Sequence, residues 1–556
     1  MHMNKKSIAL AVLFLSMSIF VLFAAYTDDR NACFSVTGDE VDVLIRLSTC
    51  IETIRPYYNE KDGVYYYFLP SVIYGNRIYN DSKDADILIN GEKMRGYSWL
   101  EWSDDVTYSL LFGENERNIR FKRSSDVAAI FISTDTGSLE ELDADKSHSE
   151  TGKIVVIEKN GMISYSGGLT MKGRGNSTFR SFSKKPYNMK LDNAAGILGM
   201  DADKDFCLLA NSWDYSYMNN KLALDMAQKA GLRYVPKAEY ADVWFNGAYW
   251  GLYLVTEKNE VGENKIDITD LEEENERANP GTDITVAETF DYGSKRGVKL
   301  ANLPDDITGG YLIERDYRLN PEYPNRVYTT SYFETEGRKC INIKSPKYAA
   351  EEEVDYIRSL VNDMEQTIMS DDGYSENGKY YLDYIDLDSW VKCYMIAEIA
   401  YDPDKDVTNT YYYKDRDSIN SKFYSGPVWD YDCRFGGTTQ NSYPDILTKL
   451  ALGGWDHYLY DKDEFYDEIK KDWNSFFEGY LRTDAPENID MWQELIRESV
   501  EMDNVRWNRN EGYSKAWPGA DNSENFITTY VFDDQVDHLR NWVEERRVFL
   551  DGCWGN

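Results

Sequence analysis

The sequence predicts an α+β fold with two lobes, preceded by a small β-rich domain. Short aromatic and β-branched runs bounded by turn residues fill residues 27–260, whereas amphipathic helical patterns dominate beyond residue 350. The chain has 556 residues, 42% of them apolar. That length has room for about three domains of ordinary size, and this apolar content is enough to bury a core.

The composition narrows the classes of function. Lys and Arg number 61 against 97 Asp and Glu, and the net charge of −36 argues against nucleic acid and against a basic membrane-binding face. His148, His457 and His538 have acidic neighbours but no nearby Cys or His partner, so His-dependent triads and His-ligated zinc are disfavoured. We therefore expect carboxylates to carry any acid–base chemistry.

The seven cysteines have no C-x-x-C spacing and no regular framework. An odd, scattered set predicts buried free thiols, although Cys33 and Cys50 could pair in an oxidising exterior. We assign no metal to them.

The N-terminus carries Lys5 and Lys6, followed by an uncharged run over residues 7–26. This pattern predicts a signal peptide cleaved after Ala24 or Ala25, or one N-terminal membrane anchor, within residues 1–26. Both alternatives predict export, either secreted or anchored at the outer face of the cytoplasmic membrane. Membrane contact is expected only through this segment, if it stays uncleaved.

Residues 27–125 predict a small β domain. Runs such as residues 64–69 and 86–89, the second closing on Asn90-Gly91, are typical of strands joined by tight turns. A protein- or carbohydrate-binding sandwich fits this pattern, but the residues leave its role open.

From Val127 the pattern becomes regular. Strands are expected over residues 127–133 and 153–158, and the Asn160-Gly161 turn leads into a strand through Lys172. The strand ends in a loop made of Gly173, Arg174, Gly175, Asn176 and Ser177. Such glycines let backbone N–H groups approach an anion, although a lone G-x-G fits an ordinary turn equally well.

The elements that follow alternate between strand and helix. Residues 184–192 predict a strand with Lys190 on the face opposite Tyr187 and Met189. A helix is expected over residues 215–230, with Asp214 as N-cap, then a hairpin of residues 240–245 and 249–255. The rest is predicted as an inserted loop region (261–306), strands (309–314 and 340–344) and helices (351–370, 389–400, 465–481, 489–502 and 534–550).

The stretch 404–437 carries the clearest chemical pattern. Asp404 is followed five residues later by Asn409, then by an aromatic strand over 411–413 and a second strand that ends in Asp430. Kinase-like folds place a catalytic base, a metal-holding amide and a metal-holding carboxylate in this order. Phosphoryl transfer is therefore our leading hypothesis, although an Asx-rich loop also fits the spacing.

Asp430 and Asp432 stand two residues apart. On a strand, such carboxylates point to the same side and could share one metal ion. Taken alone, residues 429–432 also fit a sugar- or calcium-binding edge.

Motifs in a fixed order cover roughly residues 127–551. They are Lys172-Gly173-Arg174-Gly175-Asn176-Ser177-Thr178, Lys184-Lys185-Pro186-Tyr187, Lys190-Leu191, Leu198-Gly199-Met200, Asn220-Lys221-Leu222-Ala223, Asn246-Gly247 with Tyr249-Trp250-Gly251 and Tyr253, Thr256-Glu257-Lys258, and Gly426-Pro427-Val428-Trp429-Asp430-Tyr431-Asp432. Together they resemble the CotH family, the spore-coat-protein-H-like atypical protein kinases. The resemblance implies an atypical protein-kinase-like two-lobed fold, with an N-lobe over about residues 127–260 and a C-lobe over about 307–551.

The resemblance also implies an activity. Members bind ATP with Mg²⁺ or Mn²⁺ and phosphorylate Ser on proteins, here Ser or Thr of exported or cell-surface substrates. Carried over by position, the catalytic residues would be Asp404 and Lys190, and the metal ligands Asn409, Asp430 and Asp432. The phosphate loop would be Gly173–Ser177, with Lys185 as the alternative to Lys190, and with Asp225 or else Glu257 as the acidic partner of the lysine.

Two positions depart from the family pattern. Asn219 stands where an Arg usually precedes Asn-Lys, and Cys433-Arg434 replaces an apolar pair before Phe435-Gly436. The alternative is therefore a catalytically weak or inactive cell-surface binding or structural protein with a protein or carbohydrate partner. Neither departure removes a proposed catalytic carboxylate.

Overall fold

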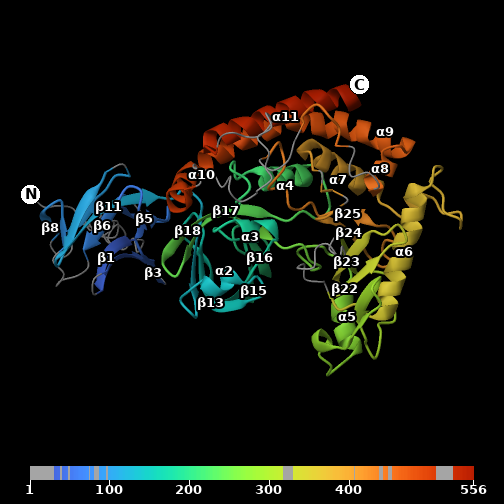
Figure 1. The fold of residues 1–556 in the computed structure, drawn as a ribbon, viewed down its shortest axis with the longest axis horizontal. Coiled ribbons are helices and arrows are strands. Elements are labelled where there is room, and N and C mark those ends of the chain that lie inside the picture. Colours follow the sequence, from blue (N-terminus) through green and yellow to red (C-terminus); the bar gives the residue numbers. More distant parts are fainter. Residues whose placement is uncertain are drawn as a thin grey trace, which may run out of the picture.

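The computed structural model describes residues 31–37, 40–47, 50–73, 75–80, 87–94, 98–104, 106–316, 330–402, 404–405, 407–437, 443–448, 454–508 and 530–555. They form a mixed α+β protein with a β-rich N-terminal region. In Figure 1 the N-terminal strands (blue) lie at one end, a barrel lies in the middle, and a second sheet with α6 lies at the other end. The predicted signal or anchor segment, residues 1–26, falls outside the described residues.

The N-terminal region consists of two sheets, ordered β3-β2-β1-β6-β9 and β4-β5-β11-β10-β7-β8. Alternation explains the first sheet: Val41, Val43 and Ile45 of β2 enter the core while the residues between them face outward. The strands are β1 Asn31–Thr37, β2 Glu40–Arg46, β3 Ile51–Ile54, β4 Tyr57–Asn59, β5 Val64–Leu69, β6 Arg77–Asn80, β7 Ile87–Ile89, β8 Glu92–Met94, β9 Trp99–Glu101, β10 Tyr108–Phe112 and β11 Asn115–Arg123. All seven cysteines are free thiols, so Cys33 and Cys50 are not paired.

The barrel closes in the order β12-β13-β14-β15-β16-β18-β17. Tyr187, Met189 and Leu191 of β15 point into its apolar interior, and Lys190 points outward as predicted. Asn246 and Gly247 both adopt positive φ in the tight turn that the sequence indicated. The strands are β12 Ala128–Thr134, β13 Ser149–Ile157, β14 Ile163–Gly173, β15 Tyr187–Ala195, β16 Asp203–Leu209, β17 Ala238–Phe245 and β18 Ala248–Glu257, with short helices α2 Glu140–Ala144 and α3 Ser177–Ser181.

Helix α4, Asn219–Lys229, begins later than the predicted residue 215, and Asp214 is not its N-cap. Met218 occupies the N-cap position, and the Asp214 carboxylate accepts hydrogen bonds from the backbone N–H groups of Ser216, Tyr217 and Asn219, the last of which is the first residue of the helix. Tyr217 has a φ of 64°, which lies outside the right-handed helical region, so a regular helix cannot extend through this residue.

The predicted loop region 261–306 contains regular structure: α5 Leu271–Ala278, the 3₁₀ turn η1 Ile284–Val286, β19 Thr289–Asp291 and β20 Lys295–Val298. The acidic composition of this region suggested a loop, but it contains a capped helix. Asp270 is the N-cap and accepts a hydrogen bond from Glu273 N–H, and Leu271 is buried. The second sheet runs β19-β20-β22-β23-β21-β24-β25. Its other strands are β21 Tyr311–Arg315, β22 Ser331–Glu334, β23 Cys340–Ser345, β24 Thr410–Lys414 and β25 Tyr424–Ser425.

The remaining helices cover the second sheet and run back toward the barrel. Helices α10 and α11 pass along one side of the molecule, where α10 contacts β18 and α4, and α11 contacts α7 (Figure 1). They are α6 Glu351–Met369, η2 Tyr381–Asp383, α7 Leu387–Ala400, α8 Trp455–Leu459, α9 Asp463–Asp472, η3 Trp473–Phe477, η4 Tyr480–Asp484, α10 Ala485–Trp507 and α11 Phe532–Trp554. The helix expected over 465–481 therefore continues from α9 through two π-helical segments.

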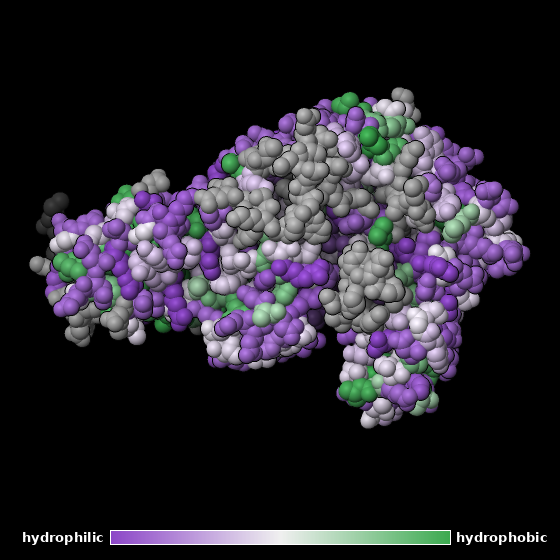
Figure 2. Space-filling model, in the orientation of Figure 1, coloured by the Kyte–Doolittle hydropathy of each residue, from purple (hydrophilic) through white to green (hydrophobic). Residues whose placement is uncertain are grey.

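The N-terminal strands share a core with the barrel exterior and α10. Trp244, Tyr249 and Met502 belong to the same buried cluster as the N-terminal strands, and the Trp244 indole donates to Phe68 O at 3.2 Å. Polar residues dominate the face shown in Figure 2, as the net charge of −36 leads one to expect. Among the described helices, none combines the length and the apolar character needed to cross a bilayer.

Candidate active site

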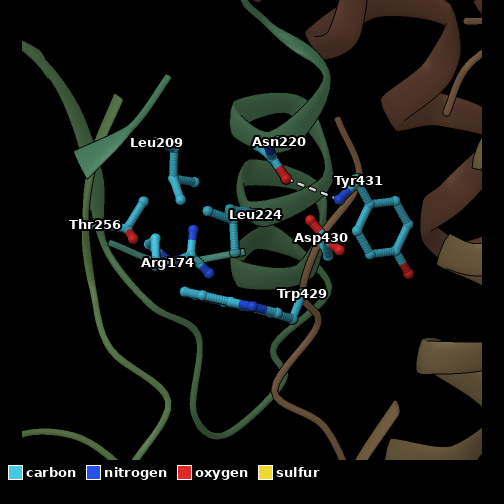
Figure 3. Close-up of a pocket in the computed structure, with 8 residues that line it drawn as sticks. All are labelled: Arg174, Leu209, Asn220, Leu224, Thr256, Trp429, Asp430 and Tyr431. Atoms are coloured by element: carbon cyan, nitrogen blue, oxygen red, sulfur yellow. Dashed lines mark hydrogen bonds between the residues drawn. The ribbon is translucent and has the colours of Figure 1, made fainter. Parts of the chain in front are cut away.

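A pocket opens where the barrel, α4 and the segment after β25 meet (Figure 3). The barrel contributes Leu209 and Thr256, and the loop after β14 contributes Arg174. Its other lining residues are Asn220 and Leu224 from α4, and Trp429, Asp430 and Tyr431. The stretch that the sequence marked for chemistry thus forms one wall of a pocket.

Asn409 and Asp430 meet at this wall. The Asn409 Nδ2 amide donates to Asp430 Oδ2 at 2.8 Å. Both residues have positive φ, 57° and 70°, a conformation that Asn and Asp tolerate better than most residues. Such backbone outliers gather at functional sites, because the surrounding structure must hold them in place.

The segment around Asp430 is not the regular strand that the sequence predicted. Strand β25 ends at Ser425, and the positive φ of Asp430 breaks the alternation that would align it with Asp432. The two carboxylates nevertheless lie close enough for the charge of Asp432 to act on Asp430.

The electrostatics of the pair favour a cation. Desolvation by surrounding protein atoms is the main cause that raises the pKa of Asp430 to about 6, and Asp432 adds to it against the attraction of Arg174 and Arg434. Desolvation also raises the pKa of Asp432. Two crowded carboxylates and an amide offer only oxygen ligands, the set that Mg²⁺ and Mn²⁺ prefer, so these residues fit the implied metal.

Asp404 lies beside this pair and is held by Arg434. The Arg434 guanidinium is 5% exposed and bridges two carboxylates, with Nε 2.5 Å from Asp402 and Nη2 2.8 Å from Asp404. The Asp404 side chain is 38% exposed against 9% for Asp402. Of the two carboxylates bound by Arg434, Asp404 is therefore the one that a substrate can reach.

The start of α4 is tied to the same segment. The Asn219 amide donates to the carbonyl oxygens of Asp432 at 3.2 Å and Arg434 at 2.9 Å. Asn220 Oδ1 accepts from Tyr431 N–H at 2.8 Å, the dashed line in Figure 3. Asn219, which departs from the family pattern, thus positions the backbone that carries the carboxylates.

The glycine loop brings one side chain to the pocket. The Arg174 guanidinium lies over the Trp429 ring, 5.2 Å from its centroid (Figure 3). Gly173 permits this path, since a Cβ there would lie 2.3 Å from the Phe179 ring. Gly175 has a φ of 74°, and Lys146 binds both Gly175 O and the Asn176 side chain, while Ser177 begins α3.

Lys190 lies on the outer face of the barrel that borders the pocket. It stands two residues from Asn188, whose Oδ1 accepts from the Cys207 thiol, and Cys207 pairs with Thr256 of the pocket wall. The Lys190 side chain is 64% exposed, and its Nζ lies 3.8 Å from Asp205. Lys190 is not among the residues that line the pocket.

In the structure Lys190 approaches Asp205, and Asp225, the partner expected from the resemblance, has other contacts. Asp225 accepts hydrogen bonds from Tyr480 and Asn488 instead, at 2.8 and 2.7 Å, so it ties α4 to the C-terminal helices. The alternative, Glu257, is buried and accepts from Lys237 N–H.

Lys185, the alternative lysine, is also engaged elsewhere. Its Nζ donates to Phe179 O and lies 4.9 Å from the centroid of the Phe179 ring. Burial lowers the pKa of Lys185.

Three contributions were not assigned from the sequence: the Trp429 ring, the clamp formed by Arg434, and Thr256. The Thr256 hydroxyl is buried without a hydrogen-bond partner among the described residues, and it lines the pocket. The substitution of an apolar pair by Cys433-Arg434 was the available signal for the clamp. Thr256 stands in the motif Thr256-Glu257-Lys258, but that motif did not indicate that its hydroxyl lines the pocket.

A barrel and a helix-covered sheet, with a pocket beside them that includes the Asp430 carboxylate, define the class as α+β. The family model described as CotH kinase protein matches residues 171–550. The chain therefore belongs to the CotH kinase family, and membership indicates an atypical kinase. No curated protein matches the chain significantly.

Proposed function

We propose that the protein is a metal-dependent kinase that transfers the γ-phosphoryl group of ATP to Ser, or Thr, of an exported protein. The observation that carries this proposal is one pocket wall on which Asn409 bonds to Asp430 while Arg434 holds Asp404 nearby. In this proposal the barrel is the N-lobe, and the second sheet with its helices is the C-lobe of a kinase-like fold.

Each group has a role in phosphoryl transfer. Asp430, Asp432 and Asn409 would hold Mg²⁺ or Mn²⁺, which when bound supplies positive charge to the phosphate oxygens. Asp404 would accept the proton of the attacking hydroxyl, and Arg434 fixes the position of that carboxylate. Arg174, which lines the pocket, and Lys190, on the outer face of the barrel, would bind phosphates.

Export is part of the proposal because residues 7–26 form an uncharged run behind Lys5 and Lys6. A cleaved signal would leave a soluble protein beginning near Ala25, whereas an uncleaved anchor would leave the full chain in the membrane fraction. Mass measurement of the exported form distinguishes the two, and a full-length cytosolic pool would contradict both.

Incubation of the purified full chain with labelled ATP, Mn²⁺ or Mg²⁺ and a Ser-rich protein tests the activity. We expect label on serine, and a nucleotide-dependent rise in melting temperature. Nucleotide at about 100 times its dissociation constant stabilises the native state by about 2.7 kcal/mol. Asp467→Asn, on the exposed face of α9, is a matched control that should leave both readouts unchanged.

Absence of transfer together with absence of nucleotide stabilisation would favour the alternative, a binding or structural protein on the same fold. Nucleotide stabilisation without transfer to any acceptor, including the protein itself, would indicate a catalytically inactive member.

A further inference from the structure

We propose a second divalent-cation site, selective for Ca²⁺, formed by Asp388, Glu468 and Asp472. One carboxylate oxygen of each residue lies within 4.8 Å of the others. Asp388 is in the first turn of α7, and Glu468 and Asp472 lie one turn apart on α9. The site is separate from the pocket, because the length of α7, 14 residues or about 20 Å, lies between Asp388 and Asp402.

Asp472 is the residue that requires a partner. It is 7% exposed, and its Oδ2 atom is buried without a hydrogen-bond donor among the described residues. A buried ionised carboxylate with no donor loses its hydration without compensation, and native proteins seldom leave such an atom unpaired. A cation placed among the three carboxylates would supply the missing interaction.

Two lysines lie close by but bind the other members. Lys392 Nζ lies 2.7 Å from Asp388, and Lys471 Nζ lies 2.5 Å from Glu468. The lysines thus leave the most buried carboxylate of the cluster without an ion-pair partner within 4 Å among the described residues.

The chemistry of the ligands selects the ion. Three carboxylates without His or Cys favour hard cations over Zn²⁺ or Cu²⁺. Ca²⁺ accepts six to eight oxygens in irregular geometry and completes its shell with water, whereas Mg²⁺ demands a near-ideal octahedron. Carboxylates fixed on two packed helices suit Ca²⁺ better, and with two competing lysines we expect a dissociation constant on the order of 10⁻⁴ to 10⁻³ M.

The site would join α7 to the end of α9. These helices contact one another, and α9 widens into the π-helical segment η3 directly after Asp472. Such π segments often mark functional positions in a helix. Bound Ca²⁺ would therefore stabilise the helical part of the protein and act without nucleotide, so its failure and that of the kinase proposal are distinguishable.

Thermal unfolding of the full chain, without nucleotide, tests the site. An Asp430→Asn/Asp432→Asn background removes the pocket carboxylates. We expect CaCl₂ at about 10 mM, roughly 10 to 100 times this dissociation constant, to raise the melting temperature of this background by about 1–2 °C over the chelated protein. Adding Asp472→Asn or Glu468→Gln should abolish the rise, whereas Asp467→Asn, an exposed carboxylate on the same helix, should retain it.

Retention of the full rise in both Asp472→Asn and Glu468→Gln would overturn the site. So would the absence of any rise in the Asp430→Asn/Asp432→Asn background, because the two lysines would then be sufficient to balance the charge of the cluster. An equal rise with MgCl₂ would overturn the assignment to Ca²⁺. If Asp472→Asn does not fold, Glu468→Gln and the exposed Asp388→Asn decide the question by the same measurement.

Discussion

At the scale of single residues, the pocket separates carboxylates by their surroundings. Asp430 and Asp432 lie together and repel each other, whereas Asp402 and Asp404 share the Arg434 guanidinium. The Asp430 and Asp432 carboxylates thus repel each other, whereas the negative charge of Asp402 and Asp404 is offset by Arg434, although all four lie in the same region. This difference predicts different effects for equivalent substitutions.

Asp430→Asn keeps the shape of the side chain but removes a charge that would face the metal. We expect nucleotide binding to become weak and largely independent of Mg²⁺ or Mn²⁺, with loss of transfer. Asp404→Asn should leave nucleotide affinity within a few-fold while turnover falls by about 10² or more, the usual scale for a positioned base. Calorimetric titration and steady-state kinetics measure the two effects.

The register of the catalytic loop is tested by the same pair of measurements. Normal turnover in Asp404→Asn, with an inactive Asp402→Asn or Asp406→Asn variant, would move the base to another position. Asp406 lies outside the described residues. Unchanged metal and nucleotide binding in all of these variants would place the site elsewhere.

Arg434→Met tests the clamp. Removing the guanidinium leaves Asp402 buried and unpaired, so we expect a loss of about 3–5 kcal/mol in the free energy of unfolding. The double variant Asp402→Asn/Arg434→Met should recover most of that stability. Its kcat should stay about tenfold low with little change in KM for ATP, because Asp404 remains unpositioned. Full recovery of kcat in the double variant would show that Arg434 is only structural.

At the scale of elements, capping and burial decide where helices begin. Tyr217 delays α4, Asp270 starts α5 within an acidic stretch, and Glu353 caps α6 by accepting from Ala350 N–H at 2.7 Å. Glu353 is fully buried and also accepts from the Asn275 amide at 3.0 Å. A carboxylate in this position gives the element a pH dependence.

Burial raises the pKa of Glu353 to about 7 from its ordinary value of 4.5, although both hydrogen bonds oppose the shift. Between about pH 4.5 and pH 7 the Glu353 carboxyl is therefore protonated in the folded state but ionised in the unfolded state. Because the folded state binds more protons in this range, the free energy of unfolding falls as the pH rises from about 4.5 through 7. Glu353→Gln cannot ionise, so at pH 8 we expect it to raise the free energy of unfolding by on the order of 2 kcal/mol.

Urea denaturation of the parent and Glu353→Gln at pH 5 and pH 8 measures this effect. The difference between the two proteins should be small at pH 5 and large at pH 8. Glu352→Gln, at the neighbouring exposed position of α6, is the control and should show the same small difference at both pH values. A constant difference for Glu353→Gln would contradict the assigned titration.

At the scale of the whole molecule, α10 holds the barrel, α4 and the N-terminal strands together. Asp503 of α10 is fully buried and accepts from Lys184 Nζ at 2.8 Å, Leu252 N–H at 3.0 Å and the Tyr217 hydroxyl at 2.7 Å. Its partners come from segments 250 or more residues away in the chain. The rigid placement of α4 against the pocket therefore depends on a helix near the C-terminus.

Asp503→Asn leaves the Lys184 ammonium buried without its counter-charge. We expect a loss of about 3–5 kcal/mol in the free energy of unfolding. The exposed Asp490→Asn on the same helix, which removes a surface pair with Arg540, should cost no more than about 1 kcal/mol. Equal effects of the two substitutions in urea denaturation would show that the buried pair does not hold these parts together.

The sequence by itself determined much of the local structure and the chemical signature. Alternating apolar residues predicted the barrel strands, and the spacing of Asp404, Asn409 and Asp430 located the pocket wall. These features depend on neighbours a few residues apart, whose relative positions follow from strand and turn geometry.

The tertiary structure alone decided the partners of charged residues. Burial of Leu222 and Met226 turns Asp225 toward the C-terminal helices, and strand register sets Lys190 opposite Asp205. The bridge from Arg434 to Asp402 and Asp404, and the pair of Lys184 with Asp503, join segments about 30 and 319 residues apart. The local sequence pattern does not predict such contacts, because they depend on how helix faces and sheets pack against one another.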